Sequence, residues 1–205
     1  MSIIIQHEKR RVLILEKALD VFVESGFTDT TFQKIADRAG ITRTILYTYF
    51  RNKHEIFNYS VKQLLTAVES DLVNVRKIKN LKSVEKLTRI VILIIERLEE
   101  NRRLLYVIRD LLATAQCDKN SADYGIRRRT VKVRHILASM VIDGIKSGEL
   151  QNVNVRTAVE LLYSVIEAAI FRLAVLKRQS VASLKDAAAL TIKQLATSDD
   201  KPEAG

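Results

Sequence analysis

The stretch from residue 30 to residue 50 decides the fold that the sequence predicts, and it reads TTFQKIADRAGITRTILYTYF. Apolar residues recur at helical spacing on both sides of its centre, Ala39-Gly40-Ile41-Thr42. Gly40 can adopt the left-handed backbone that ends a helix, and Thr42 can cap the free amides of the next one. Ile41 between them can fill the corner. The stretch therefore predicts two short helices joined by a tight turn, as in a helix-turn-helix.

Further helices are predicted on both sides of this stretch. Thr30 and Gln33 fit a Thr-x-x-Gln capping box for the first short helix. The only proline is Pro202, so no residue before it strongly breaks a helix. The apolar stripe of the first helix consists of Val12, Leu15, Ala18, Leu19 and Phe22. We expect nine helices and no sheet: one ending near residue 26, then 30–39, 43–50, 53–78, 83–100, 102–116, 121–147, 154–178 and 183–196.

Composition excludes several classes of protein. Of the 205 residues, 47% are hydrophobic and 28% are charged, which is typical of a soluble globular chain and not of a disordered one. No secretory signal is recognisable, and no uncharged stretch approaches the roughly 18 residues that a membrane span needs. One cysteine and three histidines allow neither an internal disulfide nor a Cys/His metal cluster. We expect a cytoplasmic protein without a membrane partner, metal or cofactor.

The aromatic residues are distributed unevenly along the chain. Eight of the twelve lie in residues 1–60, as expected for a small unit that needs large side chains to fill its core. The rest of the chain is Leu/Ile/Val/Ala-rich helix. We therefore expect an N-terminal three-helix domain over residues 1–55, a larger helical domain over residues 56–197 and a flexible tail over residues 198–205.

The second short helix carries the chemistry for binding DNA. With Leu46 and Phe50 facing inward, the outer face presents Arg43, Thr44, Tyr47 and Thr48. In a DNA major groove these side chains can hydrogen-bond base edges or pack on thymine methyl groups. The formal net charge of +10 fits an anionic partner. However, residues 1–60 hold only nine Lys/Arg against seven Asp/Glu, so a solvated surface explains the charge equally well.

The order and spacing of these residues resemble those of the TetR family of bacterial regulators. The matching positions are Ile14-Leu15, Ala18-Leu19, Phe22, Gly26-Phe27, Thr30-Thr31, Ile35-Ala36, Ala39-Gly40-Ile41-Thr42, Leu46-Tyr47, Tyr49-Phe50, Asn52-Lys53 and Ile56-Phe57. The resemblance covers about a quarter of the chain. It implies an all-α fold in which a DNA-binding domain precedes a larger ligand-binding and dimerisation domain.

The resemblance also implies roles for individual residues. By position, the candidates for contacting phosphates are Thr31, Thr42, Tyr49 and Lys53, and those nearer the bases are Gln33, Arg43, Thr44, Tyr47 and Thr48. Thr44 and Ile45 depart from the family pattern, in which a small residue followed by threonine is common. The operator preference of other members therefore does not transfer to this sequence.

The helix predicted over residues 154–178 is apolar around most of its circumference. Such a helix must be covered on both faces, by its own core and by a symmetry mate, and Ala168 and Ala169 would allow close approach. The family likewise dimerises through its last two long helices. The candidate homodimer residues are Tyr163, Ile166, Ala169, Ile170 and Leu173. A central buried helix of a monomer is the alternative.

The resemblance further implies a pocket for a small-molecule effector between the helices spanning residues 83–147. The candidate pocket residues are polar or polarisable groups on apolar helices: Tyr106, Arg109, Gln116, Cys117 and His135. Each of them alone is more typical of a surface residue or a satisfied core residue.

Together these patterns favour a DNA-binding transcriptional regulator. We expect a repressor that binds its operator as a homodimer and is released by the effector. The chain has no H-E-x-x-H, G-x-S-x-G, P-loop or dinucleotide motif, so we do not expect an enzyme. The alternative is a helical interaction or scaffold protein without DNA function, which salt-dependent binding of duplex DNA would distinguish.

Overall fold

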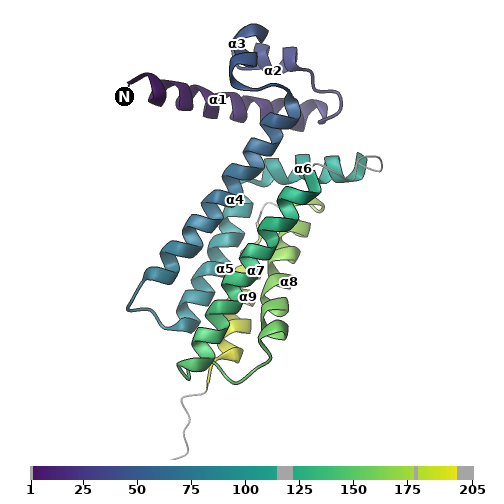
Figure 1. Cartoon of the computed structure of the whole chain (residues 1–205). Coiled ribbons are helices and arrows are strands. Elements are labelled where there is room, and N and C mark those ends of the chain that lie inside the picture. Colours follow the sequence, from purple (N-terminus) through teal and green to yellow (C-terminus); the bar gives the residue numbers. More distant parts are fainter. Residues whose placement is uncertain (1, 115–121, 178–179, 198–205) are drawn as a thin grey trace, which may run out of the picture. The chain divides into compact units, whose positions relative to one another are not determined.

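The chain is mainly helical in the part that the computed structural model describes, residues 2–114, 122–177 and 180–197 (Figure 1). These ranges contain nine α-helices and no strand, which confirms the predicted all-α class. One isolated bridge pairs Leu150 with Ala196. None of the described helices has the length and apolar character needed to cross a bilayer.

The first compact unit combines the described residues up to 65 with those from 101 to 122. It contains α1 (Ser2–Ser25), α2 (Phe32–Arg38), α3 (Arg43–Tyr49), the first part of α4 (Lys53–Lys77) and α6 (Arg102–Thr114). Aromatic rings fill its core, as their concentration near the N-terminus predicts. The Phe27 ring lies 5.0 Å from that of Phe22 and 5.7 Å from that of Phe57, measured between centroids.

The second compact unit combines residues 66–100 with the described residues from 123 onward. It contains the rest of α4, α5 (Ser83–Glu100), α7 (Ala122–Lys146), α8 (Val155–Ala174) and α9 (Ala182–Leu195). Helix α5 packs against both α8 and α9, which also pack on each other. Its buried side chains recur at intervals of three and four residues, which makes one apolar stripe: Leu87, Ile90, Val91, Ile94, Ile95 and Leu98.

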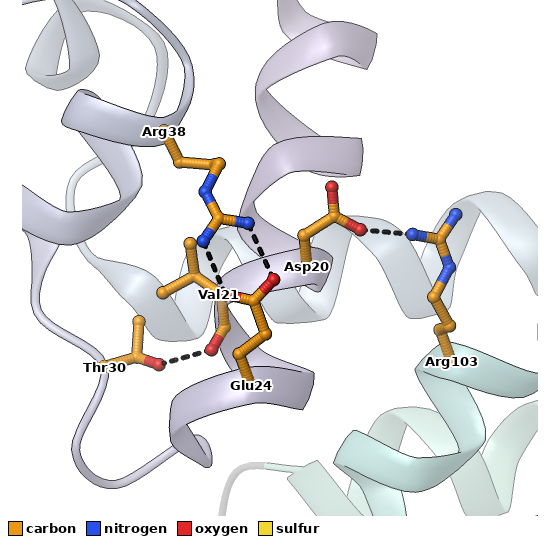
Figure 2. Close-up of polar contacts among 6 residues, drawn as sticks. All are labelled: Asp20, Val21, Glu24, Thr30, Arg38 and Arg103. Atoms are coloured by element: carbon orange, nitrogen blue, oxygen red, sulfur yellow. Dashed lines mark hydrogen bonds and ion pairs between the residues drawn. The ribbon is translucent and has the colours of Figure 1, made fainter.

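The start of α2 differs from the sequence prediction by one residue. Thr31 caps the helix, and its hydroxyl accepts a hydrogen bond from the amide three residues later at 3.2 Å. Thr30 is buried instead, and its hydroxyl donates to the carbonyl oxygen of Gly26 at 2.7 Å. It also donates to the Val21 carbonyl at 3.4 Å, the contact drawn in Figure 2. The predicted capping box of Thr30 and Gln33 is therefore wrong.

Two smaller differences concern α1 and α8. Val12, predicted in the buried stripe of the first helix, is 41% exposed, and the buried run begins at Ile14. Helix α8 is capped by Asn154, where the sequence predicts its start, but it ends at Ala174 and not near residue 178.

Candidate nucleic-acid interface

The turn between α2 and α3 has the geometry that the sequence predicts. Gly40, directly after the C-cap residue Ala39 of α2, takes a positive φ of 64°. Its amide donates to the Asp37 carbonyl at 3.1 Å, and the Ile41 amide donates to the Ala36 carbonyl at 3.0 Å. This pair of hydrogen bonds is a Schellman motif, which satisfies carbonyls at the end of α2. Ile41 is buried and fills the corner.

Helix α3 begins at this turn and is anchored by few residues. The Thr42 hydroxyl accepts a hydrogen bond from the Ile45 amide at 3.2 Å. Leu46 is fully buried, and Phe50 directly after the helix is 1% exposed. The side chains facing solvent are Arg43, Thr44, Ile45, Tyr47 and Thr48. The predicted division of α3 into an inner and an outer face is confirmed.

The side chains on the outer face of α3 are held by contacts among themselves and with α2. Arg43 Nη2 donates to the Tyr47 hydroxyl at 3.0 Å. The Tyr47 ring packs against Phe32 of α2, with centroids 4.8 Å apart. The Thr48 hydroxyl donates to the Ile45 carbonyl at 2.7 Å. Arg43 is thus held one turn from a tyrosine that rests on the neighbouring helix.

The remaining predicted residues lie at the ends of α2 and α3. Thr31 and Thr42 cap these helices and are exposed. Gln33 is also exposed, and its amide nitrogen donates to Asp37 at 2.7 Å. Tyr49 is half-buried, because its ring stacks on His7 with centroids 4.5 Å apart. The structure therefore places the predicted set, apart from Lys53, on two helices that contact each other.

Lys53 is oriented differently from the other candidates. Its Nζ donates to the carbonyl oxygens of Phe27, Thr28 and Thr30 at 2.8, 2.7 and 2.9 Å. An ammonium group has three donors, so all of them are directed at the loop before α2. Burial lowers the pKa of Lys53, and nearby Asp29 acts in the opposite direction.

Ion pairs attach α1 to two other helices of the same unit (Figure 2). Arg38 of α2 donates to both carboxylate oxygens of Glu24, with Nη1 at 2.8 Å from Oε1. Arg103 of α6 pairs with Asp20, one turn earlier on α1. The hydrogen bonds from Arg38 lower the pKa of Glu24 below its ordinary value. A surface ion pair thus links α2 to α1, in addition to their packing in the core.

The sequence patterns do not identify two features of this surface. Ile45 is 41% exposed beside the predicted polar residues. Exposed side chains near the start of α1, His7, Lys9 and Arg10, line a groove together with Ile45 and Tyr49. The run Lys9-Arg10-Arg11, directly ahead of the apolar stripe of α1, is the sequence signal for them.

The candidate pocket residues are divided between the two units. Tyr106 and Arg109 lie on α6, where Arg109 pairs with Asp110 at 2.6 Å. His135 on α7 is exposed and lines an open groove between α7 and α8. The other two candidates, Gln116 and Cys117, lie outside the described residues. Among the described side chains, no three His, Cys, Asp or Glu groups are placed to hold a metal ion.

Most of the candidate dimer residues lie on the buried face of α8, not on its exposed face. Four of the five are buried within the chain itself: Tyr163, Ile166, Ala169 and Leu173. Ile170 is half-buried. The large apolar side chains that α8 and the residues after it expose are Leu161, Phe171, Val175 and Leu176. The sequence pattern does not show this division, because an all-round apolar helix does not reveal which face meets its own core.

Comparisons with known proteins agree with this geometry. The family model "Bacterial regulatory proteins, tetR family" matches residues 14–59. The "Fatty acid metabolism regulator protein" of Bacillus subtilis (strain 168) is 24% identical over 171 residues, which cover 79% of this chain and 82% of the relative. The "Probable acrEF/envCD operon repressor" of Escherichia coli (strain K12) is 40% identical over 50 residues, 24% of this chain and 23% of the relative.

The likeness of fold extends over almost the whole chain. A TetR transcription regulator from Haloarcula marismortui ATCC 43049 superposes with a TM-score of 0.76 at 18% identity, covering 93% of this chain and 100% of that one. The matched N-terminal segment contains α2, the turn and α3, whose outer face is polar and exposed. The chain is a DNA-binding transcriptional regulator whose N-terminal segment, residues 14–59, matches the TetR family.

Proposed function

We propose that the protein reads its operator with α3 in the major groove of duplex DNA. The observation that carries this proposal is the helix itself, which buries Leu46 and exposes hydrogen-bonding side chains. Arg43, Thr44, Tyr47 and Thr48 would face base edges, together with Gln33 from α2, and Ile45 would meet thymine methyl groups. Thr31, Thr42 and Tyr49 would contact phosphates and fix the register of the helix.

The test is a titration of the protein against a duplex that it selects from a random library and against a scrambled duplex, at several salt concentrations. The proposal expects tighter binding to the selected duplex and an affinity that falls steeply with salt. Equal, salt-independent binding of both duplexes would contradict it and would favour a helical interaction protein. Because the partner is chromosomal DNA and no catalytic step is involved, we propose a regulator that acts in the cytoplasm and is not an enzyme.

We assign Lys53 a positioning role in this interface. Its three hydrogen bonds close the loop ahead of Thr31, which starts α2. This role differs from the direct phosphate contact expected by family position, because no ammonium donor remains for a phosphate.

The variants Lys53→Met and Lys53→Arg test the assignment through two measurements. Lys53→Met should lower the free energy of unfolding by about 1–2 kcal/mol and leave the salt dependence of DNA binding unchanged. Loss of a direct phosphate contact would instead lower the slope of log K against log salt by about 0.9. Lys53→Arg keeps a cation at this position, so it should recover part of the lost stability.

We propose that the protein acts as a homodimer formed by the exposed faces of α8 and α9. Leu161 and Phe171 of α8 are exposed, as is Val175 directly after the helix, and Leu190 of α9 is 60% exposed. Large apolar side chains gathered on packed helices are typical of a protein interface. A two-fold dimer would present two copies of α3 to two operator half-sites.

We further propose repression that is relieved by an effector derived from fatty acids. The Escherichia coli relative is named an operon repressor, and the Bacillus subtilis relative is named a regulator of fatty acid metabolism. An effector that causes release must bind the DNA-free protein more tightly than the operator complex. Calorimetric titration of a long-chain fatty acid and its thioester into both forms would measure this, and equal affinities would exclude release by these compounds.

A further inference from the structure

The first turns of α1 are exposed, although the rest of the helix is packed into a core. Every described side chain from Ile5 to Arg10 is exposed, and the buried run begins at Ile14. Core packing therefore does not hold these turns in place. Their position must be fixed by other contacts.

Aromatic contacts supply this attachment. The His7 ring stacks on Tyr49 of α3 at 4.5 Å between centroids, with 23° between the ring planes. The Arg11 guanidinium lies 4.2 Å from the centroid of the Tyr59 ring in α4 and 5.1 Å from that of Phe50. Cation–π and stacked contacts of this kind hold amphipathic side chains in defined positions. The start of α1 is thus fixed beside the helix proposed to enter the major groove.

The face of α1 turned toward α3 is basic. Gln6, Lys9 and Arg10 are separated by three and four residues, so they share one face of the helix. They line a groove with Ile45 and Tyr49 of α3. In the described part of the chain, neither Lys9 nor Arg10 forms an ion pair or hydrogen bond, unlike Arg38 and Arg103 of the same unit. Two cations without a neutralising partner therefore lie beside the exposed edge of α3.

We propose that Lys9 and Arg10 form a second arm of the DNA interface, which binds backbone phosphates flanking the bases that α3 reads. The inference rests on the proposed insertion of α3 into the major groove. With α3 in the groove, the sugar–phosphate strands pass along its sides, where cations on neighbouring elements can reach them. The groove between α1 and α3 would receive the strand, and the His7–Tyr49 stack would hold the arm against it.

The test compares the wild type with the double variant Lys9→Ala/Arg10→Ala on the selected duplex across a salt series. Each phosphate contact contributes about 0.9 to the slope of log K against log salt, so the double variant should lose about 1.8 per bound protomer. Its affinity at 0.1 M salt should fall by at least about tenfold. Preference for the selected over the scrambled duplex should remain, because phosphate contacts carry no sequence information.

Two control proteins separate local contact from net charge. Lys77→Ala/Lys79→Ala removes the same charge from exposed residues of the second unit and should keep a wild-type slope. Lys9→Arg/Arg10→Lys keeps both cations and should also keep it. Circular dichroism of all four proteins should show the same helix content.

The outcomes distinguish failure of this inference from failure of the proposed function. If the wild type binds with a steep salt slope and Lys9→Ala/Arg10→Ala has the same slope, the arm does not exist. The arm is equally excluded if the Lys77→Ala/Lys79→Ala control loses as much slope. If the wild type itself shows no salt-dependent binding, the proposed DNA function fails before the arm is tested.

Discussion

Helices α3 and α8 both bury apolar side chains, but they are held in different ways. Helix α3 buries one of its seven residues, whereas α8 buries eight of its twenty. A cap, a turn and a few neighbouring rings hold α3, so most of its surface can serve recognition. Packing holds α8, and its exposed apolar side chains are those that we propose to meet a second copy of the chain. Substitutions in the two helices should therefore separate folding from binding.

The largest effect is expected on the buried face of α8. Ala169→Glu places a carboxylate without a partner in the core and should lower the free energy of unfolding by about 3–5 kcal/mol. Phe171→Glu, on the exposed face, should remain folded and weaken self-association. Urea denaturation and sedimentation measure the two properties. If the Phe171→Glu protein associates as tightly as the wild type, the dimer interface does not include Phe171 and lies elsewhere.

The next largest effect concerns the one buried residue of α3. Leu46→Ala should lower the free energy of unfolding by about 3 kcal/mol, since it leaves a cavity at a fully buried position. The matched control is Ile45→Ala, one residue earlier and exposed, which should change stability by less than about 0.5 kcal/mol. Thermal unfolding of both variants checks the difference. Similar losses would mean that burial of Leu46 is not what distinguishes it from its exposed neighbour.

A smaller effect is expected at the surface of α3, and it should appear in DNA binding alone. Arg43→Ala should weaken binding to the selected duplex by about 1–3 kcal/mol and relax discrimination at one base pair per half-site. Its unfolding midpoint should match the wild type. Arg89→Ala, which removes an exposed arginine of the second unit, is the control for net charge. If both variants lost the same affinity, direct reading of a base by Arg43 would be ruled out.

The smallest effect is expected from the surface pair that ties α2 to α1. The pKa of Glu24 is lowered from its ordinary value of 4.5 in the folded protein. The stability contributed by the pair is therefore present above pH 4.5 and is lost as the pH falls through the lowered value. Glu24→Gln should flatten this part of the stability profile, measured by urea midpoints from neutral pH downward. Glu16→Gln, on the same helix, should follow the wild type.

The sequence predicts those features that depend on local signals. Gly40 and Thr42 mark the turn because a left-handed residue and a cap act within one helix turn. Leu46 is assigned inward correctly for a similar reason, since α3 is amphipathic. Periodicity alone is insufficient for α8, where apolar residues surround the helix and Ala169 cannot be told from an interface residue.

Other features depend on groups that are distant in the chain. Thr30 and Thr31 can both cap a helix. Thr31 does so here, because the Thr30 hydroxyl is hydrogen-bonded to the carbonyls of Val21 and Gly26. Lys53 has the position of a phosphate contact, but its acceptors lie 23 to 26 residues earlier. No local pattern reveals such a pairing.

The place of α6 has a consequence for the order in which the chain folds. This helix follows α5 in sequence, yet it packs with α1 in the first unit, and Asp20 meets Arg103 across 83 residues. Leu104, Leu105 and Val107 of α6 are buried. A ribosome synthesising the chain from its N-terminus must therefore release α5 before the DNA-reading unit can be completed. A fragment that ends within α4 would retain α2, the turn and α3 but would leave the α6-facing side of α1 in water.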